Sequence, residues 1–371
     1  MMSARFLTVV LERAFNMRDG FGREIDYMRI SVIDSCNLNC YYCNPCDNNE
    51  HCHALNILSV KEVLCIVRAA TRLGIKHFRL TGGEPLLHPQ LDEMVLQIKK
   101  IPGVSSVSLT TNAVLLVQHA KWLKEAGIDS INVSLDTIDA SEYERITKKP
   151  LLEEVKNGIN AAIECGIRVK INVVLTPQTD VVALTRYVAK KGTDIRFIEM
   201  MPVGEGHTNG VEPYKKVIGT LSKLYGEPCR INTEKTKEIN SGNDKRKIPD
   251  NGPAEYYIFP ELGIRVGLIQ AIHGKFCDTC NRIRVTADGR LMPCLGSSVT
   301  MDLVPDSWDF ADDVEKDFAI VRALRAAIKA KPRCHNFNDN AVTYTKTTET
   351  KTTEIEAAEV NAARNMSRIG G

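Results

Sequence analysis

The sequence lacks a strong net charge, a long apolar run and an internal repeat beyond an alternation of strands and helices. Its 371 residues include 48 Lys and Arg against 46 Asp and Glu, a net charge of +2 at pH 7. A near-neutral chain does not bind nucleic acid through bulk electrostatics, so any anion site must be a local cluster of Arg and Lys. No apolar run reaches the roughly 18 residues of a membrane helix, and residues 1–16 carry only a short, charge-interrupted apolar patch, unlike a signal peptide. We therefore expect a cytoplasmic protein that binds neither nucleic acid nor membrane.

The composition is otherwise ordinary for a soluble globular protein, with 43% hydrophobic and 25% charged residues. The length allows one large domain or two of medium size. Twelve cysteines are many for such a chain. In a cytosolic setting they indicate metal or redox chemistry rather than a disulfide framework.

Strand-like and helix-like segments alternate between residues 27 and 202. Apolar runs rich in Val and Ile predict parallel strands buried on both faces: Met28–Ile33, His77–Thr81, Val107–Thr111, Ser130–Leu135, Val169–Leu175 and Ile195–Met200. Helices are predicted between them, the first after a capping box formed by Ser59 and Glu62, and others at Lys121–Ala126, Glu154–Cys165 and Val182–Lys190. Six such units predict an α/β fold with a parallel, barrel-like sheet.

Polar residues follow several of these strands, at the edge where such barrels carry their sites. They include Gly83 and Glu84 after the second strand, Thr110 at the end of the third and Ser134 at the end of the fourth. Lys170 and Arg196 are exceptions, because they lie near the starts of their strands. We expect both to point into the barrel, where a buried cation is costly unless it meets an anion.

Three cysteines with C-x3-C-x2-C spacing, Cys36, Cys40 and Cys43, follow the first strand. Three thiolates can hold three irons of a 4Fe–4S cluster and leave the fourth iron open to a small molecule. Cys40, Cys43 and Cys46 also fit the start of the bacterial ferredoxin motif C-x2-C-x2-C-x3-C. The fourth cysteine of that motif is missing, because residue 50 is Glu50. A zinc knuckle or free thiols remain the alternatives.

A second set, Cys277, Cys280 and Cys294, has C-x2-C-x13-C spacing, and an intervening Asp-Gly turn predicts a hairpin that returns Cys294 to the pair. This set fits another cluster with an open iron, or a structural zinc site with His273 as fourth ligand. Arg282 and Arg284 alternate beside it, and paired guanidinium groups suit phosphate. Their presence favours the cluster, because a structural zinc site needs no anion receptor.

Taken together, these motifs resemble those of the GTP 3′,8-cyclases of molybdenum cofactor biosynthesis, within the radical S-adenosylmethionine (SAM) superfamily. The likeness runs from about residue 19 to the end, and its matching stretches are residues 21–29, 36–45, 79–86, 276–295 and 366–371. It implies a partial (βα)6 TIM-like barrel over residues 19–235, a C-terminal iron–sulfur domain over 236–340, and a tail over 341–371 that ends in Gly-Gly.

The resemblance also implies residue roles. Cys36, Cys40 and Cys43 would hold the cluster that binds SAM, and Cys277, Cys280 and Cys294 a second 4Fe–4S cluster beside the guanine of GTP. The implied SAM contacts are Tyr42, Gly83, Ser134 and Met201. The implied GTP contacts are Arg29, Arg79, Thr110, Lys170, Arg196, Arg282 and Arg284, and Gly370 and Gly371 would join Arg282 and Arg284 in catalysis.

The implied reaction starts when a 5′-deoxyadenosyl radical takes hydrogen from ribose C3′, and the C3′ radical then attacks C8 of guanine. A cyclic pyranopterin monophosphate synthase would use the product, an electron donor would be needed, and a homodimer is left open. His77 departs from the family, which often has Lys there, as does Ala113, where Gly is usual. Two other hypotheses stay open: a radical SAM enzyme acting on a peptide or other small molecule, and a non-catalytic iron–sulfur or zinc scaffold.

Overall fold

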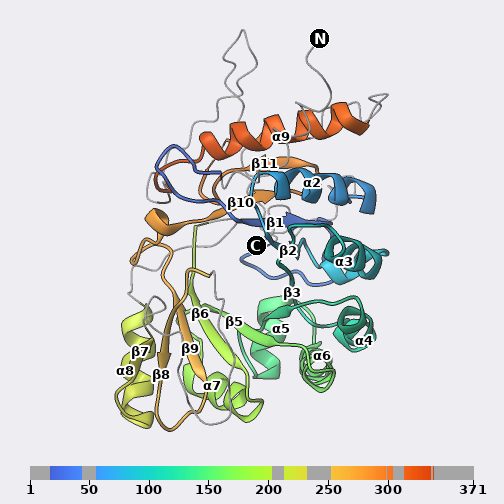
Figure 1. Ribbon diagram of the computed structural model, residues 1–371. Helices are drawn as coiled ribbons and strands as arrows, with labels where there is room; N and C mark the ends of the chain where they lie inside the picture. Colours follow the sequence, from blue (N-terminus) through green and yellow to red (C-terminus); the bar gives the residue numbers. More distant parts are fainter. Residues whose placement is uncertain are drawn as a thin grey trace, which may run out of the picture.

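The computed structural model describes residues 17–43, 56–202, 213–231, 252–297, 299–303, 313–335 and 337 (Figure 1). Cys46, the Thr-rich stretch after residue 342 and the terminal Gly370 and Gly371 lie outside these residues. Within them, no helix has both the length and the apolar character needed to span a membrane.

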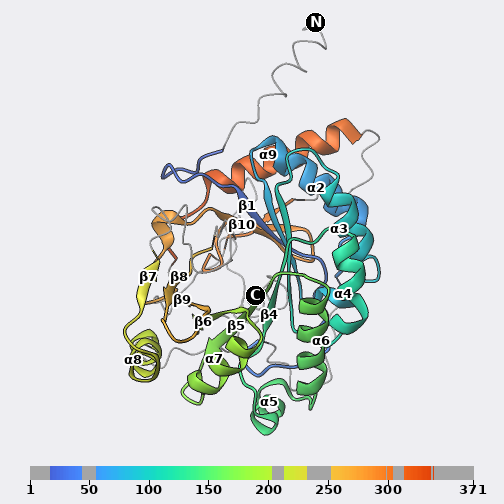
Figure 2. The ribbon, with the colours of Figure 1, turned by 60° about the horizontal axis from the view of Figure 1, so that its bottom comes forward.

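Six parallel strands follow one another in a single sheet, as the sequence predicts. They are β1 (Tyr27–Ser31), β2 (His77–Thr81), β3 (Ser106–Thr111), β4 (Ser130–Ser134), β5 (Val169–Leu175) and β6 (Asp194–Glu199). Each predicted strand end lies within two residues of the observed one. The apolar runs are buried because helices cover the outer face of the sheet, as Figure 2 shows.

The C-terminal part of the chain extends both edges of this sheet. β10 (Arg282–Val285) pairs in parallel with β1, and β9 (Arg265–Ile269) pairs in parallel with β6. Antiparallel strands continue outward on each side: β11 (Arg290–Met292) and β12 (Met301–Asp302) beyond β10, and β8 (Glu255–Ile258) and β7 (Cys229–Ile231) beyond β9.

The sheet of the described residues therefore has β12 and β7 as its two edges and does not close on itself. This agrees with the predicted partial barrel. The sequence did not predict that strands from residue 229 onward take part in the same sheet as β1 to β6. The predicted domain boundary at residues 235 and 236 lies outside the described residues, so the domain division stays a prediction.

The helices are α2 (Val60–Arg72), α3 (Leu91–Lys99), α4 (Leu116–Glu125), α5 (Ala140–Thr147), α6 (Leu152–Glu164), α7 (Val181–Lys190), α8 (Pro213–Tyr225) and α9 (Asp313–Lys329). The predicted capping box is confirmed: Ser59 Oγ accepts from Glu62 N, and Glu62 Oε2 accepts from Ser59 N. No residue range is predicted from the sequence for α3, α5, α8 or α9, and α9 packs against α2. Short 3-10 helices occupy Pro85–Leu87 and Cys277–Thr279.

Close packing between α6 and the turn after β3 depends on a glycine in α6. A Cβ atom at Gly158 would lie 2.3 Å from the carbonyl oxygen of Ala113 and 3.0 Å from Cβ of Leu116. Ala113 has φ of +66°, a left-handed conformation that costs Ala more than Gly. The turn is therefore already constrained, and it cannot move away from α6 without further strain.

We expect Gly158→Ala to lower the free energy of unfolding by about 1 to 3 kcal/mol, because overpacking forces backbone shifts. Gly219→Ala, in α8, is the matched control, because nothing lies within 4 Å of the position that its Cβ atom would take. The control should be neutral or stabilising by up to about 1 kcal/mol. Anaerobic denaturant unfolding compares the two, and equal effects would contradict the packing argument.

Candidate active site

One large cavity lies inside the partial barrel, with a volume of about 830 Å³. Every predicted site residue within the described part of the chain lines it: Arg29, Cys36, Cys40, Tyr42, Cys43, Arg79, Gly83, Thr110, Ser134, Lys170, Arg196, Met201, Cys277, Cys280, Arg282, Arg284 and Cys294. The volume is within the range of small-ligand sites. The fold thus brings together residues that are up to 265 positions apart in the sequence, from Arg29 to Cys294.

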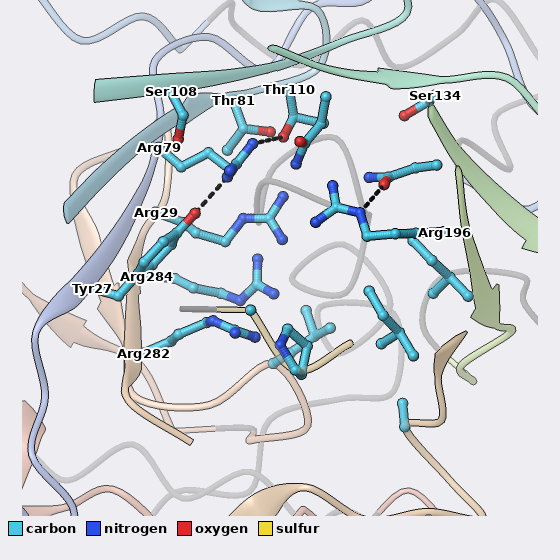
Figure 3. A pocket seen from close by; sticks show the side chains of 18 of the residues that line it. Tyr27, Arg29, Arg79, Thr81, Ser108, Thr110, Ser134, Arg196, Arg282 and Arg284 are labelled. Carbon is cyan, nitrogen blue, oxygen red and sulfur yellow. Dashed lines mark hydrogen bonds between the residues drawn. The ribbon is translucent and has the colours of Figure 1, made fainter. Parts of the chain in front are cut away.

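Guanidinium groups from four strands face one another across this cavity (Figure 3). The register of β10 on β1 places Arg284 opposite Arg29, and that of β1 on β2 places Arg29 opposite Arg79. Arg282 lies on the same wall, and Arg196 reaches in from β6 on the opposite side. Lys170 and Arg196 do point into the barrel, as predicted from their positions near the strand starts.

Burial and mutual repulsion act on these cations. Burial, reinforced by Arg284, holds the pKa of Arg29 well below its usual value. Burial and Arg282 lower the pKa of Arg284 to about 10. A group of like charges in a low-dielectric cavity is costly, and an anionic ligand relieves that cost. The only carboxylates that line the cavity in the described residues are Asp129 and Asp136.

Fixed hydrogen bonds orient two of the guanidinium groups. Arg79 Nε donates to Tyr27 Oη at 2.5 Å, and Arg196 Nε donates to Asn172 Oδ1 at 2.9 Å. Arg196 Nη2 is buried and has no hydrogen-bond partner among the described residues. A buried donor of this kind is unfavourable unless a ligand accepts from it. Lys170 Nζ lies 3.5 Å from Tyr256 Oη.

The first cysteine set lies in the loop after β1. Burial raises the pKa of Cys36 to about 11 and that of Cys43 to about 12, and repulsion from Cys36 adds to the shift of Cys43. Burial, with repulsion from Cys43 and Asp136, also raises the pKa of Cys40. Three half-buried thiols that repel one another as thiolates fit a metal cluster, whose iron ions stabilise all three.

The loop that carries Cys36 is held by the second strand's Gly-Gly-Glu segment. A Cβ atom at Gly83 would lie 2.1 Å from the carbonyl oxygen of Ser35, so this close approach requires glycine. Buried Glu84 accepts from Thr111 Oγ1 and from Asn112 N, both at 2.7 Å. Asn112 Nδ2 in turn lies 3.8 Å from Cys36 Sγ. Glu84 also caps the 3-10 helix Pro85–Leu87, because it accepts from Leu86 N.

The second cysteine set follows the predicted hairpin, because β10 and β11 pair antiparallel and return Cys294 toward Cys280. Burial opposes ionisation of Cys280, but Lys331 and Arg282 outweigh it and lower its pKa. Burial raises the pKa of Cys294 despite Lys331. The soft donor set and the shared cavity again fit an iron–sulfur cluster.

The zinc alternative fits the side chains less well. His273 Nδ1 forms an ion-pair contact with Glu199, and His273 does not line the cavity. Within the described residues, no three His, Cys, Asp or Glu side chains approach closely enough to hold a single metal ion. A cluster spreads its cysteine ligands over separate irons, so it does not need this convergence.

Three of the four residues assigned to SAM, Tyr42, Gly83 and Ser134, lie near the first cysteine set. Tyr42 Oη donates to Asp136 Oδ2 at 2.5 Å, and Asp136 Oδ1 accepts from Val174 N at 2.7 Å. Ser134 is exposed to the cavity at the end of β4 (Figure 3). Met201 lines the cavity and also packs against Met292.

Sequence reasoning assigned no role to three residues that shape the site. Tyr27 orients Arg79, and Asn172 orients Arg196. Lys331 donates to the carbonyl oxygens of Arg282 and Pro293, which lie near Cys280 and Cys294 in the sequence. Asn172 lies on the predicted strand Val169–Leu175, where alternation could have placed it on the inner face. Tyr27 directly precedes the predicted strand Met28–Ile33 and is the first residue of the observed β1. Lys331 follows α9, and no local pattern in the sequence connects it to the cysteines.

The chain matches two family models in succession. Residues 30–183 match the Radical SAM superfamily, and residues 193–337 match Molybdenum Cofactor Synthesis C. The fold and the cysteine loop after β1 therefore define a radical SAM protein with a molybdenum cofactor synthesis C-terminal part.

Curated relatives specify the family. The GTP 3′,8-cyclase of Clostridium perfringens (strain SM101 / Type A) is 35% identical over 324 residues, which cover 86% of this chain and 95% of the relative. That of Pelotomaculum thermopropionicum is 36% identical over 327 residues, with 86% and 95% covered. The chain belongs to the GTP 3′,8-cyclase family.

Solved structures share the fold at low sequence identity. Streptococcus suis SuiB bound to S-adenosylmethionine has a TM-score of 0.55 and 15% identity, and the match covers 80% of this chain and 68% of that one. SuiB bound to its precursor peptide SuiA has a TM-score of 0.53 and 14% identity, with 79% and 62% covered. This likeness confirms the radical SAM type of fold that the sequence predicts.

The network around Glu84 predicts a pH dependence of stability. Burial raises the pKa of Glu84 from its ordinary 4.5 to about 7. The folded state therefore binds the proton more tightly than the unfolded state, and this group's contribution is full below pH 4.5 and is lost as the pH rises through 7. The unfolding free energy of the wild type relative to Glu84→Gln should fall by about 2 to 3 kcal/mol between pH 5 and pH 8. Anaerobic denaturant unfolding at both pH values measures this, and a constant difference would refute the assignment.

Proposed function

We propose that this chain is a radical SAM GTP 3′,8-cyclase, which converts GTP to (8S)-3′,8-cyclo-7,8-dihydroguanosine 5′-triphosphate in molybdenum cofactor biosynthesis. The observation that carries the proposal is a single cavity that joins two cysteine sets through a group of cationic side chains. Neither a peptide-modifying enzyme nor a metal scaffold needs such a group, whereas a triphosphate has several negative charges to be compensated. Family membership supports the same reaction.

In this proposal the GTP triphosphate lies against the guanidinium groups. Arg29, Arg79 and Arg284 form one wall, and Arg196 supplies its buried, unpartnered Nη2 from the opposite side. Bidentate hydrogen bonds from arginine fix both the position and the direction of a phosphate group. Thr110 and Lys170 complete the polar lining, and the guanine ring extends toward Cys277, Cys280 and Cys294.

The first cysteine set and the SAM contacts occupy the other part of the cavity. Cys36, Cys40 and Cys43 would hold a 4Fe–4S cluster, with Tyr42, Gly83, Ser134 and Met201 against SAM. When bound, the cluster and SAM supply a 5′-deoxyadenosyl radical. The cavity walls hold ribose C3′ facing that source and keep water away from the reacting atoms.

For this reaction the protein must mainly position the substrate, and it needs few acid–base groups. The C3′–H bond breaks, a C3′–C8 bond forms, and the resulting radical takes up one electron and one proton, so the product is an isomer of GTP. Arg282 and Arg284 line the cavity, so their positive charges would lie beside the nucleotide throughout the reaction. Gly370 and Gly371 keep their proposed place at the site, although they lie outside the described residues.

The partners follow from the same proposal. GTP is the substrate, an electron donor supplies reducing equivalents, and a cyclic pyranopterin monophosphate synthase takes up the product. We also propose that the chain acts in the cytoplasm and that a homodimer is compatible with this activity.

The decisive experiment is an anaerobic reaction of the iron–sulfur-reconstituted protein with SAM, GTP and a strong reductant, analysed by mass spectrometry. GTP-dependent 5′-deoxyadenosine together with a cyclised isomer of GTP would establish the activity. Formation of 5′-deoxyadenosine with no GTP-derived product would retain the radical SAM chemistry and overturn the proposed substrate.

Cys40→Ala should abolish SAM cleavage and lower the iron content from about eight to about four atoms per chain, because only the second cluster remains. Cys229→Ala is the control, since Cys229 is exposed on β7 and does not line the cavity. Iron and sulfide analysis with a 5′-deoxyadenosine assay provides the test. Full SAM cleavage by Cys40→Ala would contradict the ligand assignment.

Arg284→Ala should raise the Kd for GTP about 10- to 100-fold, which corresponds to the loss of charge-assisted hydrogen bonds. SAM cleavage uncoupled from GTP should persist, because the first cysteine set is intact. The matched control is Arg230→Ala, whose side chain is exposed and paired with Glu255 on the outer strands. Equilibrium binding of GTP measures the effect, and unchanged affinity in Arg284→Ala would show that this arginine does not contact the nucleotide.

A further inference from the structure

A buried lysine ties together the two backbone segments that carry the second cysteine set. Lys331 is only 3% exposed, and its ammonium donates to the carbonyl oxygens of Arg282 and Pro293, each at 2.8 Å. Arg282 lies two residues after Cys280, and Pro293 directly precedes Cys294. The ammonium therefore bridges the two strands of the hairpin at the level of their cysteines.

Among the described residues, no carboxylate forms an ion pair with this ammonium. A buried ammonium that has only carbonyl partners is costly, because carbonyl dipoles compensate a full charge incompletely. The acidic groups with which it does interact are the thiols of Cys280 and Cys294.

A second cation keeps Lys331 in place. Arg23 Nη2 donates to the carbonyl oxygen of Pro332 at 2.6 Å, and its Nη1 donates to that of Cys277 at 2.7 Å. The Arg23 side chain is itself held by a buried ion pair with Asp19 at 2.5 Å. The segment after α9 therefore cannot withdraw the ammonium from the cysteines without breaking these contacts as well.

We propose that Lys331 is a positioning residue for the second cluster: its ammonium fixes the separation of the segments that carry Cys280 and Cys294 and compensates the negative charge of their sulfurs. The inference rests on the proposed function, because it requires a cluster at this site. A one-electron reduction adds negative charge to such a cluster, and a fixed positive charge in a dry site favours the reduced form. Lys331 therefore raises the reduction potential of the cluster.

The test uses the full chain with Cys36, Cys40 and Cys43 replaced by Ala, so that only the second site can hold iron. In this background, Lys331→Met removes the charge at nearly equal size, and Lys331→Arg retains it. Lys329→Met is the matched control, because Lys329 is exposed at the end of α9. Iron and sulfide analysis and a dye-mediated redox titration followed by electron paramagnetic resonance are the measurements.

Lys331→Met should shift the one-electron reduction equilibrium at least about tenfold toward the oxidised cluster, which equals about 59 mV to lower potential. Lys331→Arg and Lys329→Met should remain within about threefold of the background chain. An unchanged potential in Lys331→Met overturns the inference.

Two further results separate the possible failures. If Lys331→Met retains no cluster, the titration is made on Lys331→Gln, whose amide still donates hydrogen bonds but has no charge, and the same tenfold shift is expected. If the background chain itself binds no iron and sulfide, the proposed second cluster is wrong. That result would refute the proposed function at this site, whereas an intact cluster with an unchanged potential would refute only the role of Lys331.

Discussion

Repulsion among buried cations is the constraint on which the rest of this structure depends. Arg29, Arg282 and Arg284 share one wall of a cavity in which burial already disfavours their charged forms. The fold tolerates this arrangement because acceptors orient the guanidinium groups, as Tyr27 does for Arg79, and because thiols lie at both ends of the cavity. Such a site is unfavourable when empty, and a bound polyanion would remove the repulsion and the desolvation cost together.

Strand pairing at the two edges of the partial barrel creates this concentration of charge. β10 brings Arg282 and Arg284 next to β1, and β9 lies against β6, which carries Arg196. Side chains at directly paired positions point to the same face of a sheet, so the pairing of Arg284 with Arg29 turns both guanidinium groups toward the cavity. The C-terminal part of the chain thereby supplies side chains to the cavity that β1 to β6 begin.

The two cysteine sets are held by different physical means. The loop that carries Cys36 is held by close backbone packing and by a buried carboxylate. Gly83 lets its segment approach the backbone of this loop, and Glu84 fixes Asn112 beside the sulfur of Cys36. Around Cys280 and Cys294, a hairpin provides the framework and the Lys331 ammonium provides countercharge. The first environment disfavours negative charge on the sulfurs, whereas the second, at Cys280, favours it.

Among the cavity residues, Arg29, Tyr42, Arg79 and Met201 are expected only from the resemblance to the family. The sequence itself predicts the six β–α units, the capping box at Ser59 and the two cysteine sets, because periodicity and cysteine spacing are local properties of the chain. It did not show that β9 and β10 extend the barrel sheet, nor that Lys331 lies among the cysteines. Those features depend on backbone and side-chain hydrogen bonds between distant segments, such as Tyr27 and Arg282 in neighbouring strands. Local patterns predict which residues face inward, but only tertiary packing decides which inward-facing residues meet.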